Sequence, residues 1–358
     1  MLKKILMAAL ILSVLAAGIA FASGGQENAG AKKYTYRLGK VPYTLENAYH
    51  QSVIAIGREY AEKMYNAEYI AIDGQANNEK TLAAVETLIQ QKVDAIALHT
   101  GDAGLMTTAI KLAHKAGIPI VTTLIRPTEK LAPHIQPLEA PSSERMGEVA
   151  ATQWLKAHPD THCKVAMLDF GGFEQIEEMR TGPFIKGVKS VDPNAVLVAQ
   201  LNGYGSTDKS MEVTLDILQA HPEVNIIFGA NDEMGLGALA ACEQLGRGKM
   251  NNGVPITEVI AGLDGNIAGM LEIYNPNSSF KLTHGAVRDN AVKEVDTMIA
   301  MIKKQIPMDV YQEQQVLSVE MDYWNTPILQ AQRFLEDNYM YKGVLADDVA
   351  KKAAQKKG

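Results

Sequence analysis

The clearest chemical signal in the chain is a group of polar residues that follows an apolar segment. Ile226, Ile227 and Phe228 are apolar, and after two small residues come Asn231, Asp232 and Glu233. This order is typical of a buried strand that ends where a helix begins. Small molecules bind at the carboxyl ends of strands in open α/β sheets. Asn231 is therefore placed to bind a small molecule, although it could instead be the N-cap of the following helix.

Motifs for covalent or metal chemistry are absent from the sequence. There is no nucleophile elbow, no phosphate-binding loop and no metal-binding spacing of cysteine and histidine. The two cysteines, Cys163 and Cys242, fall in an expected strand and an expected helix, and we interpret them as buried, unpaired thiols, although an exported protein could form a disulfide. We therefore expect no catalytic residue, no metal and no cofactor, which means that the protein is not an enzyme.

The segments that would position such a site alternate between strand and helix. Leu82, Val85, Leu88 and Ile89 have the spacing of an amphipathic helix. Strands that alternate with helices indicate βαβ units, a parallel sheet and helices on both of its faces. The expected strands are residues 34–41, 69–72, 95–99 and 118–122, then 165–170, 195–201, 226–230 and 259–263. The expected helices are residues 47–65, 79–91, 103–115, 174–190, 207–219 and 232–245.

A proline-rich stretch, Arg126 to Pro141, separates the two runs of strands and helices. It also contains Pro127, Pro133 and Pro137. Stretches of this composition mark domain boundaries, and ligand sites favour the interfaces between domains. The sequence therefore predicts an α/β protein with two similar, doubly wound parallel-sheet lobes and a ligand cleft between them.

The first residues have the composition of an export signal. Two lysines precede an apolar segment, Ile5 to Phe21, and small residues flank Phe21. A membrane anchor would need about 20 apolar residues. We expect a signal peptide over residues 1–22, cleaved after Ala22, and a flexible leader over residues 23–33. The protein is therefore expected in the periplasm or outside the cell.

The charge balance is acidic and excludes one class of partner. The formal net charge is −7, and loss of the two lysines of the signal peptide would make it −9. Binding of nucleic acid needs clustered basic residues, so no nucleic acid partner is expected. The basic tail, residues 346–358, has a Lys-rich end, Lys351 to Lys357, which we interpret as a solvated helix tail rather than a binding arm.

Five short segments occur in an informative order along the chain: Thr44–His50, Asp73–Asn78, Gly117–Val121, Phe228–Met234 and Gly262–Gly265. In order and spacing they resemble the sugar-binding proteins of bacterial ABC importers, of the ribose-binding type. The resemblance extends from about residue 40 to residue 319. It implies a periplasmic binding protein of type I fold, a superfamily that also contains the effector domain of the LacI repressors.

The resemblance also implies how the lobes are joined. Three hinge crossings would lie near Pro137, Ala286 and Glu313. The N-terminal lobe would be residues 34–136 plus 287–312, and the C-terminal lobe residues 137–286 plus 313–345. The lobes of a monomer would close on a monosaccharide or polyol, and a membrane ABC permease would then receive the closed form.

The resemblance assigns ligand contacts to individual residues. Asn231, Asp264 and Arg180 would hydrogen-bond to sugar hydroxyls, and Tyr49 and Tyr204 would pack on the apolar faces of the sugar. Each has a structural alternative, such as a turn for Asp264, a solvated charge for Arg180 and a loop for Tyr204. The remaining candidate ligand-binding residues are Asn47, His50, His99, Arg126 and His284.

Three departures from the pattern of the family concern specificity. Ile125 stands where a sugar-binding aspartate is common, His99 where an asparagine is common, and Ala286 where a glutamine would contact the ligand. These departures weaken the case for ribose itself. Another pentose or hexose, a polyol, or a partly anionic sugar derivative remain open.

Three other functions are compatible with parts of the sequence. A LacI-type repressor would need a DNA-binding segment ahead of residue 34, where the expected signal peptide lies. An exported enzyme would need one of the missing motifs. A receptor protein that binds a ligand and docks to a chemoreceptor or sensor kinase would have the same sequence features, and neighbouring genes for a permease and an ATPase would separate transport from sensing.

Overall fold

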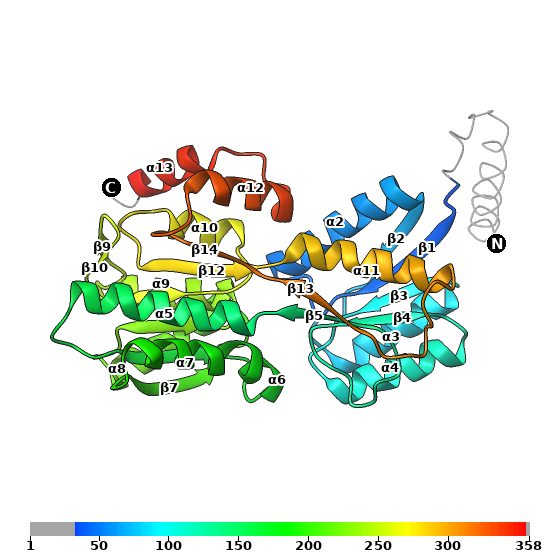
Figure 1. Cartoon of the computed structure of the whole chain (residues 1–358), viewed down its shortest axis with the longest axis horizontal. Coiled ribbons are helices and arrows are strands. Elements are labelled where there is room, and N and C mark those ends of the chain that lie inside the picture. The colour runs from blue at the N-terminus through cyan, green and yellow to red at the C-terminus, as the bar shows by residue number, and fades with distance from the viewer. Residues whose placement is uncertain (1–32, 356–358) are drawn as a thin grey trace, which may run out of the picture. The chain divides into compact units, whose positions relative to one another are not determined.

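The computed structural model of the protein describes residues 33–355. The expected signal peptide and nearly all of the expected leader lie outside this range. Within it, no helix combines the length and the apolar character needed to cross a bilayer. The described chain contains two six-stranded sheets, each with helices packed on it (Figure 1), which confirms the predicted α/β class with two parallel-dominated sheets.

The first sheet is parallel throughout, with strand order β13-β5-β4-β3-β1-β2. Its strands are β1 (Tyr36–Val41), β2 (Ala67–Ala71), β3 (Ala95–Leu98), β4 (Ile120–Thr123), β5 (His134–Leu138) and β13 (Glu313–Leu317). Its helices are α2 (Ala48–Tyr65), α3 (Asn78–Gln90), α4 (Ala103–Lys115) and α11 (Val287–Ile302). Helices α2 and α11 pack together on one face, and α3 and α4 cover the other (Figure 1).

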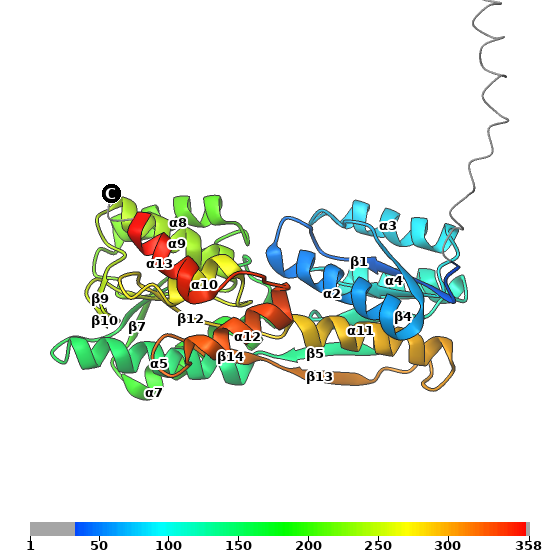
Figure 2. The ribbon, with the colours of Figure 1, turned by 90° about the horizontal axis from the view of Figure 1, so that it is seen from above.

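The second sheet has the order β14-β12-β11-β8-β6-β7, and only its edge strand β14 runs antiparallel to its neighbour. Its strands are β6 (Lys164–Asp169), β7 (Val196–Asn202), β8 (Ile226–Gly229), β11 (Val259–Ala261), β12 (Phe280–Gly285) and β14 (Val319–Asp322). Its longer helices are α5 (Ala140–Ala157), α7 (Gly182–Val191), α8 (Thr207–Ala220), α9 (Asp232–Gln244), α12 (Ile328–Tyr339) and α13 (Leu345–Gln355). Helices α5 and α7 lie on one face, and α8 and α9 on the other (Figure 2).

Shorter elements complete the second lobe. They are α6 (Glu174–Ile176), α10 (Ile267–Ile273), and the paired β9 (Met250–Asn251) and β10 (Val254–Pro255). A π-helical turn, Glu177–Thr181, connects α6 to α7 where the sequence predicted one continuous helix. Such turns insert an extra residue into a helix and often occur at functional sites.

Three chain crossings connect the lobes, and the third differs from our expectation. Pro137 lies inside β5, which pairs with β4 and β13 in the first sheet, so the first crossing follows at Glu139. Strand β13 also belongs to the first sheet, and the next strand, β14, belongs to the second. The third crossing is therefore Ser318 rather than Glu313, because pairing with β5 keeps β13 in the first lobe. The second crossing is Ala286, between β12 and α11.

A buried ion pair holds α11 on the first sheet. Lys40 of β1 and Glu294 of α11 are each 1% exposed, and their side chains lie 2.5 Å apart. Thr123 of β4 donates a second hydrogen bond to the same carboxylate oxygen. Because helix α11 is distant in sequence from both strands, this pair joins the late segment of the first lobe to its early strands.

The C-terminal helix α13 is anchored to the second lobe by its first turns. Leu345 and Val349 of α13 are buried, and α13 packs on α10. Lys352 forms an ion pair with Glu272. The start of α13 therefore packs on the second lobe through its apolar face, while residues 351–355 are exposed or half-buried, as expected for the solvated end of a helix.

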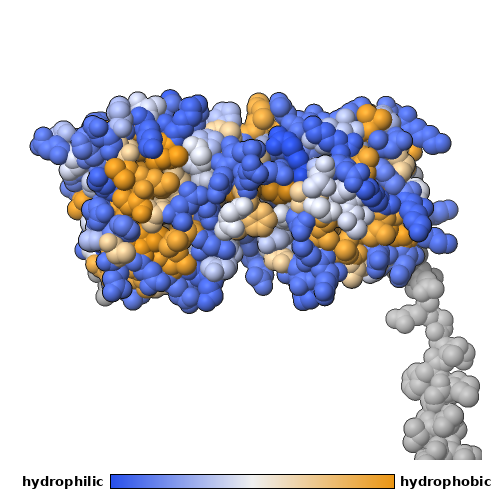
Figure 3. All heavy atoms as spheres, turned by 90° about the horizontal axis from the view of Figure 1, so that it is seen from below, coloured by the Kyte–Doolittle hydropathy of each residue, from blue (hydrophilic) through white to orange (hydrophobic). Residues whose placement is uncertain are grey.

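Two further features of the described chain concern its surface and its thiols. Figure 3 shows apolar areas within an otherwise hydrophilic face, and the edge strand β7 leaves Val196, Leu197 and Leu201 exposed. Cys163 and Cys242 are both buried and free, as the sequence predicted.

Candidate functional site

A cavity of about 360 Å³ lies between the two sheets and takes residues from both lobes. Pockets for small ligands start at roughly this volume. The first lobe contributes the loops that follow β1, β3 and β4, and the second contributes those that follow β6, β7, β8 and β11. The carboxyl ends of two parallel sheets therefore face one cavity, which is where α/β proteins bind ligands.

The cavity brings together most of the residues that the sequence singled out. Eight of the ten candidates line it: Asn47, Tyr49, His50, His99, Arg180, Tyr204, Asn231 and Asp264. Arg126 and His284 do not belong to its lining. The guanidinium of Arg126 pairs with Glu313, and the His284 ring is buried against Ser143.

Asn231 combines the two roles that the sequence left open. It follows β8 and is the N-cap of α9, where its side-chain oxygen accepts from the backbone N–H of Met234 at 2.9 Å. Its amide nitrogen donates to the carbonyl of Gly205 at 3.2 Å. Asn231 thus fixes the loop after β7 and still borders the cavity.

Arg180 lies in the π-helical turn, where it is buried and is not a solvated charge. It is 6% exposed, and its Nε and Nη2 donate to both oxygens of Glu139 at 2.6 and 3.0 Å. Its Nη1 donates to the carbonyl of Ala230 at 2.7 Å. A guanidinium has five N–H groups, so two remain for a ligand within the described structure. The first hinge crossing, which contains Glu139, therefore neutralises and orients the arginine of the cavity.

Asp264 presents a buried carboxylate without a donor. It is 7% exposed, it lines the cavity, and none of the described residues donates a hydrogen bond to its side chain. Burial, together with the nearby Glu233 carboxylate, raises the pKa of Asp264 well above its ordinary value. Its backbone φ of +116° lies in a region that favours glycine. Strain of this kind persists where the surrounding structure enforces it, and it is frequent at ligand sites.

Two histidines from the first lobe form one polar wall. His50 of α2 and His99 after β3 pack edge to face, with ring centroids 4.8 Å apart. Burial lowers the pKa of His50 to about 3 and that of His99 well below its ordinary value. Both rings are therefore neutral at physiological pH, and each offers one donor and one acceptor.

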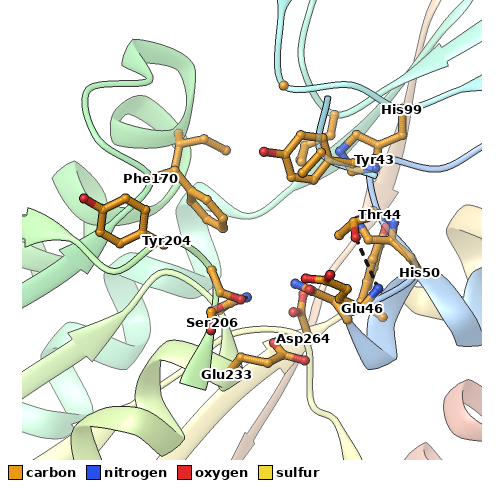
Figure 4. Close-up of a pocket in the computed structure, with 18 of the residues that line it drawn as sticks. Tyr43, Thr44, Glu46, His50, His99, Phe170, Tyr204, Ser206, Glu233 and Asp264 are labelled. Carbon is orange, nitrogen blue, oxygen red and sulfur yellow. Dashed lines mark hydrogen bonds between the residues drawn. The ribbon is translucent and has the colours of Figure 1, made fainter. Parts of the chain in front are cut away.

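Aromatic side chains form the apolar walls. Tyr204 is 63% exposed and stands at a positive φ of 58°, while Phe170 faces the same space from the end of β6 (Figure 4). On the side of the first lobe, Tyr43 lies beside His99 (Figure 4). Tyr49 accepts a hydrogen bond from Asn290, which fixes its ring. Rings arranged in this way can pack on the C–H faces of a carbohydrate.

Sequence reasoning missed several residues of the cavity. The acidic ones are Glu46, Glu139, Asp208 and Glu233, and the others include Tyr43, Phe170, Phe173 and Ser206. Phe170 and Glu233 could have been found by the rule that selected Asn231, since each lies just beyond the end of a strand. No local sequence pattern pointed to Glu139, because its pairing with Arg180 depends on where the hinge crossing lies in the fold.

Polar contacts also join the lobes around the cavity. The backbone N–H of Arg126 donates to the side chain of Gln175, whose amide donates back to the carbonyl of Arg126. The backbone N–H of Ala48, at the start of α2, donates to the carboxylate of Glu233 on α9. Arg126 and Glu233 therefore connect loops of one lobe to the other.

The described residues offer no group of three or more histidine, cysteine, aspartate and glutamate side chains arranged to hold a metal ion. Ser143 and His284 lie 3.1 Å apart, but both are fully buried and do not border the cavity. The cavity itself presents hydrogen-bonding groups and rings, which suit reversible binding of a polar ligand.

Known proteins that are similar to this chain are solute-binding proteins. The ribose import binding protein of Bacillus subtilis is 30% identical over 240 residues, or 67% of this chain and 72% of that protein. A xylitol-binding protein of Mycolicibacterium smegmatis is 25% identical over 78% of this chain and 79% of that protein. A periplasmic solute binding protein of an ABC transporter from Actinobacillus succinogenes, solved with bound D-allose, matches with a TM-score of 0.67 and 24% identity, over 83% of this chain and 99% of that chain. Because a model of the periplasmic binding protein domain matches residues 38–306, the chain belongs to that family.

Proposed function

We propose that this chain is the solute-binding protein of an ABC importer and that it captures a monosaccharide or a related polyol in the cleft between its lobes. The main support for this proposal is the cavity, which combines buried polar groups with aromatic walls at the carboxyl ends of the strands of two sheets. Relatives named for ribose and xylitol, and a structural relative solved with D-allose, support a carbohydrate or polyol as the ligand class.

Different side chains would make different kinds of contact with the ligand. The two remaining N–H groups of Arg180 would donate to hydroxyl or ring oxygens, and Asp264 would accept from hydroxyls. His50 and His99 would each supply one donor and one acceptor as neutral rings. Tyr49 and Tyr204 would pack on the C–H faces of the ligand.

The three crossings at Glu139, Ala286 and Ser318 would let the lobes move about a common hinge. A ligand that contacts both lobes stabilises the closed arrangement, and a permease can then distinguish loaded from empty protein. Small-angle scattering should show a smaller radius of gyration when the ligand is bound.

Isothermal titration calorimetry of the purified protein against sugars and polyols tests the proposal. We expect binding at micromolar or lower concentration for at least one of them. Asn231→Ala and Asp264→Ala should each weaken that binding by about 1–3 kcal/mol, because buried polar partners lose their hydrogen bonds. Asp337→Asn is the matched control, since Asp337 is exposed on α12 and outside the cavity lining. No heat with any member of the panel would refute the proposed function.

The remaining parts of the proposal have their own tests. The bound ligand should be recovered chemically unchanged after long incubation, since we propose binding without catalysis. The exported protein should begin at Ser23 in N-terminal sequencing if the signal peptide is cleaved after Ala22. Analytical ultracentrifugation should give the mass of a monomer.

A further inference from the structure

The charges that line the cavity are unbalanced. Its lining contains one guanidinium, that of Arg180, and five carboxyl groups: Glu46, Glu139, Asp208, Glu233 and Asp264. Glu139 and Arg180 neutralise each other in a bidentate pair. Arg180 also acts electrostatically on Asp264, so a single guanidinium faces five carboxyl groups in the lining. The neutral rings of His50 and His99 add no positive charge.

Other nearby cations are already paired. Arg126, at the rim, forms its ion pair with Glu313. Lys40, beneath the first lobe's wall, is buried in its pair with Glu294. Neither side chain belongs to the cavity lining. Lys209 acts electrostatically on Asp208, but it forms its ion pair with Glu212 and does not line the cavity either. Carboxyl groups therefore outnumber the cations at the cavity.

The Asp264 carboxyl group and one oxygen of Glu233 also lack hydrogen-bond donors. The Asp264 side chain is buried and has no donor among the described residues. One oxygen of Glu233, Oε2, is buried without a partner. Burying such groups costs free energy unless a partner is provided, and closure of the lobes would bury them further. An ammonium group has three donors, no acceptor and a positive charge, so it supplies what both carboxyl groups lack.

The carboxyl groups and the rings occupy different parts of the cavity. In the view of Figure 4, Glu46, Glu233 and Asp264 lie toward one end, while Phe170 and Tyr204 stand along one side and Tyr43 along the other, and Glu233 interacts electrostatically with Asp264. An aromatic face attracts a cation as well as the C–H groups of a sugar. The arrangement suits a sugar ring held between the aromatic side chains, with a cationic substituent directed toward the acidic end.

We propose that the cleft takes a cationic carbohydrate, of the amino-sugar class, in preference to the corresponding neutral or acidic sugar. The inference rests on the proposed function, because it names the ligand class of the same cleft. A sugar acid would add a further carboxylate to a site where the carboxyl groups of Glu233 and Asp264 already disfavour each other's charged form. A neutral sugar would leave the acidic end without a counter-charge.

Calorimetry with matched probes tests this inference. Each set contains a neutral sugar, its 2-amino derivative and its uronic acid: glucose, glucosamine and glucuronate, then galactose, galactosamine and galacturonate, then mannose, mannosamine and mannuronate. We expect at least one amino sugar to bind ten-fold or more tightly than its neutral parent, and no uronate to bind. Asp264→Asn and Glu233→Gln should each reduce the preference for the amino sugar at least five-fold, whereas Asp337→Asn should leave it unchanged.

The outcomes separate this inference from the proposed function. If a neutral sugar or polyol binds as tightly as the amino sugars, or if a uronate binds more tightly, the charge preference is refuted and the sugar-binding function stands. An unchanged preference in both carboxyl variants, each checked for folding by circular dichroism, would also refute it. If no amino sugar, neutral sugar or polyol binds, the proposed function fails as well.

Discussion

Replacing Asp264 with glycine should stabilise the fold while it removes a ligand contact. Asp264 has a φ of +116°, where a side chain costs about 1–3 kcal/mol of strain. The backbone has little room to relax, since a Cβ added to Gly285 on β12 would lie only 2.2 Å from the carbonyl oxygen of Asp264. The strain is therefore enforced by the packing of β12 against this loop.

Comparison of Asp264→Gly with Asp264→Ala isolates the strain. Both variants lose the carboxyl group, but only alanine keeps the Cβ. Alanine usually gains about 0.4–1 kcal/mol over glycine through the lower entropy of the unfolded chain. Subtracting this from the strain predicts that the glycine variant is more stable than the alanine variant by about 1–2 kcal/mol.

Urea denaturation followed by circular dichroism measures this difference as a change in the free energy of unfolding. The matched control is Asp337, exposed in the last turn of helix α12, where alanine should be more stable than glycine by up to about 1 kcal/mol. Both Asp264 variants should bind ligand more weakly in calorimetry. If Asp264→Ala is as stable as Asp264→Gly, the backbone at this position is not strained and the reasoning fails.

Three further predictions concern the polar groups around the cavity. Glu139→Gln should lower the free energy of unfolding by about 3–5 kcal/mol, because it leaves the Arg180 charge buried without its counter-charge. Glu313→Gln breaks the partly exposed Arg126–Glu313 pair and should lower the free energy of unfolding by about 1 kcal/mol or less. Equal losses for Glu139→Gln and Glu313→Gln in urea denaturation would contradict this difference. Asn231→Ala should cost about 1 kcal/mol through the lost N-cap, whereas an unchanged midpoint would mean that the cap contributes nothing. Burial lowers the pKa of His50 from its ordinary 6.5 to about 3. Between these two pH values the unfolded chain binds the proton and the folded chain does not, so the free energy of unfolding decreases as the pH falls from 6.5 to about 3. In His50→Gln the free energy of unfolding should decrease by about 1.4 kcal/mol less per pH unit over this range. If the free energy of unfolding of the variant and of the parent depends on pH in the same way, the prediction is wrong.

Local patterns in the sequence predicted most of the individual elements. Apolar runs gave the central strands of both sheets because parallel strands are covered on both faces. Helix α4 has the expected bounds, and α2 and α9 differ by a residue at one end. Strand β5 lies in the proline-rich stretch that we interpreted as a boundary, and the helices α5, α11 and α12 were not predicted.

Some of the cavity residues at strand ends could also be predicted from the sequence. Asn231 was selected because it follows an apolar run, and the structure places it at the cavity. The resemblance to a family added residues such as Tyr204 and Asp264, whose local patterns also fit ordinary turns. Glu46 and Glu139 lie in loops with no comparable pattern, which is why they were missed.

The sequence by itself determined the fold class, the alternation of strands and helices, and several of the polar residues at strand ends. Periodicity and residue type are local properties, so they are readable without the fold. Only the tertiary structure decided that Arg180 is neutralised by Glu139, that Asp264 is strained, and that β13 stays in the first lobe. Each of these depends on contacts between distant segments, and such contacts leave no signal in the local order of residues.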